Sequence, residues 1–218
     1  MESSMIILYQ GGQGEYTEKK SRFIASIFPV QSEEEALENI ARIRKEHYDA
    51  RHNCFAYVIG DNNETERCSD DGEPSGTAGR PILDVLTGNG IHNAAAVVTR
   101  YFGGTLLGTG GLVRSYTAAV KDALEHCVLL EQCRGFRLRV RMDYNDVGRL
   151  QHLFRTMELT ELDTIYGAEV EEVLLVPSDR IDRVEDEITE KTAGRAVLHR
   201  QEELRFGMAG GEVILLQN

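Results

Sequence analysis

Apolar and polar positions recur along the chain with two different periods, and each period predicts a kind of secondary structure. Residues 21–30 are rich in β-branched and aromatic side chains and predict a strand ending near Pro29. The next segment carries apolar residues at helical spacing, and Ser32 with Glu35 forms the capping box typical of a helix start. Residues 53–60 predict a second strand. The N-terminal part therefore mixes strands and helices.

A connection of about twenty residues follows the second strand, which is longer than structureless connections usually are, so we expect it to be functional or mobile. Pro81 suits the first turn of a short helix, because proline there loses no helical hydrogen bond. Residues 93–102 predict a buried strand. The next helix is expected to begin near Gly110, and its apolar stripe consists of Leu112, Val113, Tyr116, Ala119, Val120, Ala123, Leu124 and Cys127.

The pattern changes beyond a short hinge predicted at residues 131–135. Apolar residues from Phe136 to Met142 alternate with arginines, as in a strand with one buried face. A helix, two further strands, a second helix and a last strand are predicted to follow. This β-α-β-β-α-β order predicts a ferredoxin-like unit. We therefore predict an α+β protein with two domains, residues 1–134 and residues 135–218.

Charge and composition narrow the classes of function. The net charge of −12 argues against broad, sequence-independent binding of nucleic acid, so any anion site must be local. The sequence shows neither a signal peptide nor an apolar run of the roughly 20 residues that a membrane helix needs. We expect a soluble, cytoplasmic protein with no membrane partner. The cysteines and histidines lack metal-site spacing, so neither a metal nor a cofactor is expected.

Two glycine-rich stretches, residues 70–83 and 97–116, indicate a binding site. In the second stretch, a buried strand ends at Arg100, and a glycine loop leads into a helix. Free backbone N–H groups and the positive end of the helix then meet at one point, where Arg100 and Arg114 are available to an oxyanion. The loop is not a phosphate-binding Walker A motif, because Thr109 stands where that motif has lysine. The alternative is that these glycines only allow close packing.

The first glycine-rich stretch is suited to close over a ligand held by the second, or else its serine and threonine only complete turns and a helix cap. A hydrolase is a further alternative, with Ser75 activated by His52 and either Asp70 or Asp71, although the sequence lacks the GxSxG elbow. No catalytic residue is therefore assigned. The predicted ligand-binding residues are Glu73, Ser75, Gly76, Thr77, Arg80, Arg100, Tyr101, Gly103, Gly104, Gly108, Gly110, Gly111 and Arg114.

Four segments resemble the IMPACT/YigZ family: EKKSRFIA, HNCFAYVIG, DDGEPSGTAGRPIL and VVTRYFGGTLLGTGGLVRSY. The C-terminal part is similar to the extra domain of the bacterial YigZ-type members. The resemblance implies an N-terminal α/β domain like the second domain of a small-subunit ribosomal protein. It also implies a C-terminal ferredoxin-like domain like those of elongation factor G.

The same resemblance implies a link to translation. Eukaryotic relatives damp the amino-acid-starvation response, a stress response, by competing with its kinase for a ribosome-associated activator protein. Those relatives carry a different accessory domain in place of residues 136–218. We expect a non-enzymatic regulator that engages the ribosome or a translation-associated protein. Its glycine-loop pocket is expected to hold a phosphate of RNA or of a nucleotide.

The predicted C-terminal sheet supports an alternative hypothesis for the function. Three arginines share one face of a predicted strand: Arg137, Arg139 and Arg141. Acidic residues are suited to lie on the neighbouring strands: Glu161, Asp163, Glu169 and Glu171. Cross-strand ion pairs are the expected arrangement, because an RNA-reading sheet of this topology needs exposed aromatic residues that are lacking here. In this alternative the mixed-charge face docks a protein partner, and the glycine loops are structural.

Overall fold

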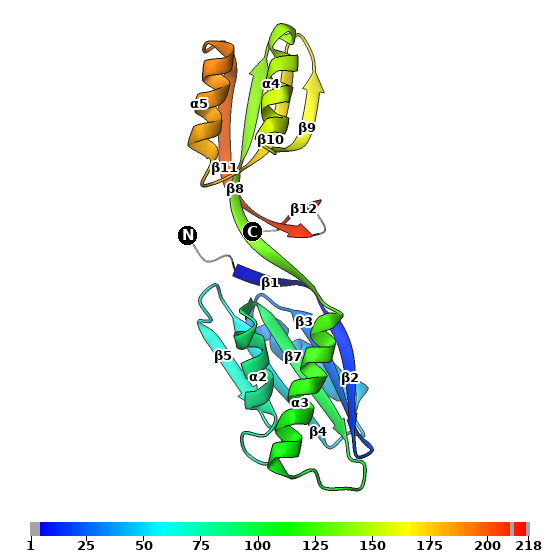
Figure 1. Cartoon of the computed structure of the whole chain (residues 1–218). Helices are drawn as coiled ribbons and strands as arrows, with labels where there is room; N and C mark the ends of the chain where they lie inside the picture. The colour runs from blue at the N-terminus through cyan, green and yellow to red at the C-terminus, as the bar shows by residue number, and fades with distance from the viewer. Residues whose placement is uncertain (1–4, 210–211, 217–218) are drawn as a thin grey trace. The chain divides into compact units, whose positions relative to one another are not determined.

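Five strands of the N-terminal half form an antiparallel sheet (Figure 1). The computed structural model describes residues 5–209 and 212–216. The chain divides into two units, Met1–Glu131 and Gln132–Asn218. In order across the sheet, the strands of the first unit are β2 (Gly12–Glu18), β3 (Ser21–Pro29), β7 (Ala94–Tyr101), β4 (His52–Ile59) and β5 (Thr65–Ser69).

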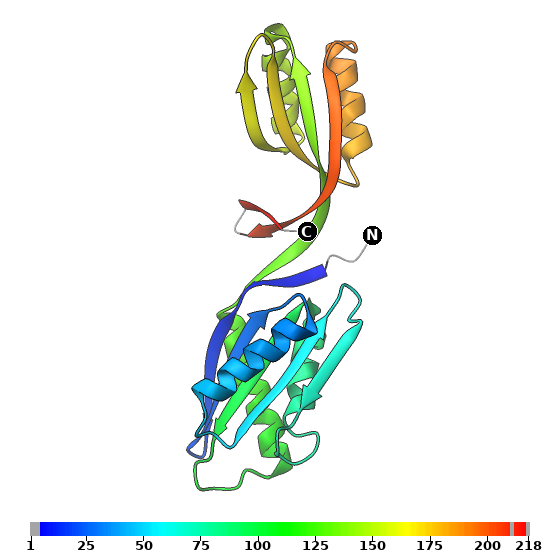
Figure 2. The same ribbon diagram turned by 180° about the vertical axis from the view of Figure 1, so that it is seen from behind.

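Helices cover both faces of this sheet, which explains why β7 is apolar along nearly its whole length. Helices α2 (Gly79–Gly88) and α3 (Gly108–Glu125) lie on one face (Figure 1), and α1 (Glu33–Glu46) lies on the other (Figure 2). A short parallel pair, β1 (Met5–Gln10) with β6 (Ile91–His92), adds Leu8 and Ile91 to the core beneath α2 and α3.

Three local expectations for the first unit need correction. The connection after β4 is not a continuous loop, because β5 lies within it and pairs with β4. This edge strand is polar and largely exposed, so its sequence lacks the alternation of apolar and polar residues that would reveal a strand. Helix α3 begins at Gly108 instead of Gly110. Ser32 caps α1 through the Glu35 N–H at 3.2 Å, but the Glu35 carboxylate accepts from the Gln31 N–H instead of closing the box on Ser32.

The C-terminal unit has the predicted β-α-β-β-α-β order. Strands β11, β8, β10 and β9 lie side by side in that sequence, which is the ferredoxin-like arrangement, and β12 pairs with β11. Helices α4 and α5 cover one face, over the core of Leu138, Val140, Leu150, Leu174 and Val184. The bounds are β8 (Val128–Met142), α4 (Tyr144–Thr156), β9 (Thr160–Tyr166), β10 (Val170–Pro177), α5 (Ile181–Thr192), β11 (Val197–Ala209) and β12 (Glu212–Leu215).

The predicted hinge at residues 131–135 is extended backbone within β8. Further along β8, the expected cross-strand ion pairs are confirmed: Arg139 lies 3.0 Å from Glu171, and Arg141 lies 3.2 Å from Glu169. Both pairs are substantially exposed, so each contributes less than about 1 kcal/mol to stability.

Candidate functional site

A cavity of about 440 Å³ opens where the two glycine-rich stretches meet. The first stretch contributes part of its wall, and the second contributes the end of β7, the following loop and the first residues of α3. The end of β7 and the start of α3 can be followed in Figure 1. The lining residues are Arg51, His52, Glu73, Pro74, Arg100, Phe102, Leu106, Leu107, Gly108, Thr109 and Leu112.

Asp70 shapes the first stretch by binding backbone N–H groups with its side chain. Its carboxylate accepts from Gly76 at 2.8 Å, from Ala78 at 2.9 Å and from Gly79 at 2.8 Å, which caps the start of α2. Partial desolvation tends to raise the pKa of Asp70, but the hydrogen bonds from this backbone outweigh it, so the pKa is lowered. Asp70 is therefore a structural anion that fixes the loop carrying Glu73.

Glu73 and Arg100 form a buried ion pair at the cavity wall. Their side chains are only 3% and 7% exposed, and Arg100 Nη1 lies 2.6 Å from Glu73 Oε1. The Tyr116 hydroxyl, on α3, donates to the same oxygen at 2.8 Å. The guanidinium lies over the rings of Phe23 and Phe102. Arg100 is thus paired, in contrast to the expectation that its charge is available to a ligand.

Glu73 does not satisfy every buried donor of Arg100. The Nε–H of Arg100 is buried and has no hydrogen-bond partner in the part of the chain that the structure describes. A buried donor without an acceptor costs about 1–3 kcal/mol, so Arg100 keeps an unmet hydrogen-bonding requirement at the cavity wall.

Cys54 and Tyr116 extend the buried cluster below the pair. The Cys54 Sγ lies 3.3 Å from the Tyr116 hydroxyl and 3.0 Å from the Asp70 carbonyl oxygen. Burial raises the pKa of the Cys54 thiol to about 12 and also raises the pKa of Tyr116. Both groups are neutral near pH 7, so Cys54 is an unreactive thiol here.

The start of α3 lies at the cavity, and no side chain among the described residues caps its first N–H groups. Its N-cap, Leu107, makes no side-chain cap hydrogen bond, and Gly108 and Thr109 line the cavity. Gly108 has φ +70°, a left-handed conformation that glycine adopts without strain. Gly103 has a different role, since a Cβ there would lie 2.1 Å from the Lys20 backbone. The loop packs closely, and the helix still presents an electropositive end to the cavity.

The predicted site residues divide between the cavity and its surroundings. Glu73, Arg100 and Gly108 line it. Gly110, Gly111 and Arg114 lie in the first two turns of α3 and are not part of the lining. Gly76 and Thr77 hold the loop through bonds to Asp70 and to the Pro74 carbonyl oxygen. The remaining predicted residues also lie outside the lining: Ser75, Arg80, Tyr101, Gly103 and Gly104.

Two of these residues have clear alternative partners. Arg80 is exposed and pairs with Asp84, one turn along α2, at 2.7 Å. The Tyr101 hydroxyl lies 3.0 Å from His47 Nδ1 and 3.0 Å from Asp49 Oδ1, next to the end of α1. Because side chains alternate along a strand, Tyr101 faces away from Arg100.

The hypothetical catalytic triad is not assembled. His52 Nδ1 lies 2.8 Å from the Asp71 carbonyl oxygen, which can only accept, so Nδ1 carries the hydrogen in this bond. Asp70 serves as a helix cap, and the Asp71 carboxylate accepts from the Asn53 N–H and from Arg44. Ser75 is exposed, and no hydrogen bond joins it to His52 among the described residues.

Sequence reasoning missed several lining residues. Arg51 precedes β4 and is exposed, as an ordinary surface arginine would be. Phe102 and Leu106 are 51% and 84% exposed. Large apolar residues inside a glycine loop are a signal that was available, since a loop that serves only as a turn does not need them. Tyr116 was assigned to the core stripe, and its hydroxyl contact follows only from the tertiary fold.

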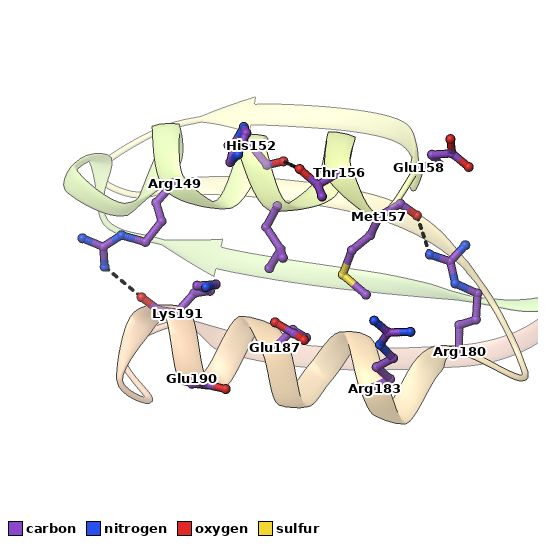
Figure 3. Close-up of a pocket in the computed structure, with 11 residues that line it drawn as sticks. Arg149, His152, Thr156, Met157, Glu158, Arg180, Arg183, Glu187, Glu190 and Lys191 are labelled. Carbon is purple, nitrogen blue, oxygen red and sulfur yellow. Dashed lines mark hydrogen bonds between the residues drawn. The ribbon is translucent and has the colours of Figure 1, made fainter.

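A second cavity, of about 940 Å³, lies between α4 and α5 in the C-terminal unit (Figure 3). At each of its two ends, an arginine from one helix donates a hydrogen bond to the backbone of the other helix. Arg149 on α4 donates to the Lys191 carbonyl oxygen at the end of α5, at 2.8 Å, and Arg180 at the start of α5 donates to the Met157 carbonyl oxygen at the end of α4. Each helix is therefore capped by an arginine from the other.

Within residues 5–209 and 212–216, no group of three or more His, Cys, Asp or Glu side chains is arranged to hold a metal ion. Among the same residues, none of the helices is both long and apolar enough to span a bilayer.

Comparison with known proteins assigns both units. The Impact N-terminal domain matches residues 19–124, and a domain of unknown function, DUF1949, matches residues 140–195. The IMPACT family member YvyE of Bacillus subtilis is 38% identical over 196 residues, 90% of each chain. YigZ of Escherichia coli is 34% identical over 187 residues, 85% of this chain and 92% of its own.

A crystal structure of a hypothetical protein has a TM-score of 0.58 and 32% identity, and the match covers 93% of this chain and 99% of that one. The sequence similarity to YvyE and YigZ extends through both units. As the resemblance of the glycine-rich stretches indicates, the chain belongs to the IMPACT family.

Proposed function

We propose that this protein is a non-enzymatic regulator linked to translation, which binds a phosphate-bearing ligand, RNA or a nucleotide, at the cavity between its glycine-rich stretches. The observation that carries the proposal is the uncapped start of α3, which meets Arg51, His52 and the buried Arg100 at one cavity. Helix N-termini attract anions through free N–H groups and the helix dipole, and arginine adds charge-assisted hydrogen bonds.

Membership in the IMPACT family supports a role linked to translation. The chain's net charge of −12 sets a limit on how it engages RNA, since the negative surface repels a polyanion outside the cavity. A local contact with one phosphate group fits both facts. We propose cytoplasmic action on the ribosome or on a protein associated with it.

Arg51 is the best position for a test, because it lines the cavity and is exposed, so its replacement spares the buried pair. We expect wild-type protein to sediment with ribosomes from lysate at low salt and to dissociate as salt rises. Arg51→Glu should weaken this association about tenfold or more, since a charged hydrogen bond is worth about 1.5–3 kcal/mol. Arg67→Glu, on the exposed part of β5, makes the same charge change outside the cavity and should sediment like wild type.

Equal sedimentation of Arg51→Glu and wild type would remove the cavity from the proposal. If wild type does not sediment at all, the ribosome is not the partner. Both variants need the wild-type thermal unfolding profile before the comparison is made.

The C-terminal sheet supports a second candidate function, docking of a protein partner. Its open face presents Arg137, Arg139 and Arg141 beside acidic residues, and Ile165 on β9 is 49% exposed. Under this candidate, Arg137→Glu combined with Arg139→Glu abolishes sedimentation, and Arg51→Glu has no effect.

A further inference from the structure

The cavity lining separates into an apolar part and a polar part. Pro74, Phe102, Leu106, Leu107 and Leu112 form the apolar part. Phe102 and Leu106 are 51% and 84% exposed, so their side chains leave large apolar surface uncovered in the chain described. Water against this surface is unfavourable, and a ligand with a planar apolar body would displace it.

The polar part consists of two kinds of groups. Arg100 lines the cavity and is 6% exposed, and its buried Nε–H has no hydrogen-bond partner among the described residues. The first turn of α3 and Arg51 supply donors suited to an anion. Glu73 is held by Arg100 and Tyr116, so the pair supplies fixed polar groups for the edge of a ligand.

An inorganic phosphate would bind at the start of α3 and would leave the apolar part of the lining in contact with water. A sugar phosphate would place hydroxyl groups against leucine and phenylalanine. In a duplex, the faces of each base pair stack on the adjacent base pairs, so they could not contact Phe102. A single unpaired nucleotide meets every group of the lining, because its base has two apolar faces and a polar edge and is joined to a phosphate.

We infer that the cavity binds one unpaired nucleotide, with its base against Phe102 and Leu106 and its phosphate at the start of α3. The inference rests on the proposed function and adds recognition of the base to it. The cavity volume of about 440 Å³ lies in the range of small-ligand sites, about 300–1,000 Å³. Aromatic stacking is sequence-tolerant, so either a purine or a pyrimidine is accepted.

The experiment compares four probes by NMR, following the backbone amide signals of Gly108, Gly110 and Gly111 in the full 24.4 kDa chain. The probes are adenosine 5′-monophosphate, ribose 5-phosphate, adenosine and a five-residue single-stranded oligoadenylate. We expect the mononucleotide to bind at least about tenfold more tightly than ribose 5-phosphate, as stacking of one base provides.

Leu106→Ser is expected to reduce nucleotide affinity towards that of ribose 5-phosphate, while leaving ribose 5-phosphate binding unchanged. Leu106 is mostly exposed, so this variant does not disturb the core. Leu37→Ser is the matched control, since Leu37 is 50% exposed on α1, on the opposite face of the sheet.

Each outcome decides a separate point. Equal affinity for the mononucleotide and ribose 5-phosphate overturns the base contact and leaves phosphate binding intact. Binding of adenosine as tightly as its monophosphate overturns the proposed phosphate site but supports the base contact. If none of the probes shifts the glycine signals, both the inference and the proposed function fail. Tighter binding of the oligoadenylate than of the mononucleotide supports the inference with RNA as the source, and equal binding supports it with free nucleotide.

Discussion

Replacing Glu73 with alanine is expected to lower the free energy of unfolding of the N-terminal unit by about 3–5 kcal/mol, because it leaves the guanidinium of Arg100 buried without a counter-charge. Tyr116 loses its acceptor in the same variant. Hydrogen exchange of the β7 amides in the full chain measures the loss within the correct unit, and calorimetric unfolding measures it for the whole protein.

Glu15→Ala is the matched control for this comparison. The Glu15 carboxylate lies 2.8 Å from Arg22, but these side chains are 43% and 53% exposed. Removing this pair should cost no more than about 1 kcal/mol. Glu73→Gln, which keeps an acceptor for Tyr116, should fall between the two. Similar losses for Glu73→Ala and Glu15→Ala would show that the buried pair does not stabilise the unit.

The second large effect is expected at Asp70, whose carboxylate accepts three backbone hydrogen bonds. Asp70→Ala removes all three and should cost at least about 2 kcal/mol, since a single helix cap contributes up to about that amount. Asp70→Asn keeps a neutral acceptor and should cost less. Chemical denaturation of each variant followed by far-ultraviolet circular dichroism gives these differences.

Asp70 also predicts a pH dependence. Its pKa in the folded chain is lowered from 3.8, so the folded state favours the ionised form. The stabilisation is therefore complete above the unfolded pKa near 4 and is lost as pH falls through the folded value. Asp70→Asn should flatten this acid-side loss relative to wild type. Asp84→Asn, an exposed change on the same helix, should retain the wild-type slope; an unchanged slope in Asp70→Asn would contradict the prediction.

Periodicity was enough to predict most elements. Most of the predicted apolar stripe of α3 is buried, but Val113 is exposed and Cys127 lies beyond the end of the helix. The alternation in β8 and the β-α-β-β-α-β order appear as predicted. Strand β5 could not be predicted in this way, because an exposed edge strand needs no buried face. The apparent hinge at residues 131–135 reflected a local change in composition, which does not prevent the backbone from staying extended.

The candidate site was only partly predictable. The glycine-rich stretches showed which segments form the cavity. A strand-to-helix junction with free N–H groups depends only on the local sequence, so it could be predicted. The state of Arg100 is not local: its partner Glu73 is separated from it by 27 positions, and only the sheet brings the two side chains together. For the same reason, the sequence could not show that Arg100, predicted as a ligand contact, is also held by a buried carboxylate at the cavity wall.

The reciprocal arginines between α4 and α5 restrict how the C-terminal unit can change length during evolution. Arg149 meets the end of α5 and Arg180 meets the end of α4, so an inserted residue inside either helix would displace one arginine from its carbonyl partner (Figure 3). Insertions and deletions should instead accumulate in the turn at residues 167–169, which joins β9 to β10 outside both contacts. Aligned relatives with intact helices should show gaps there.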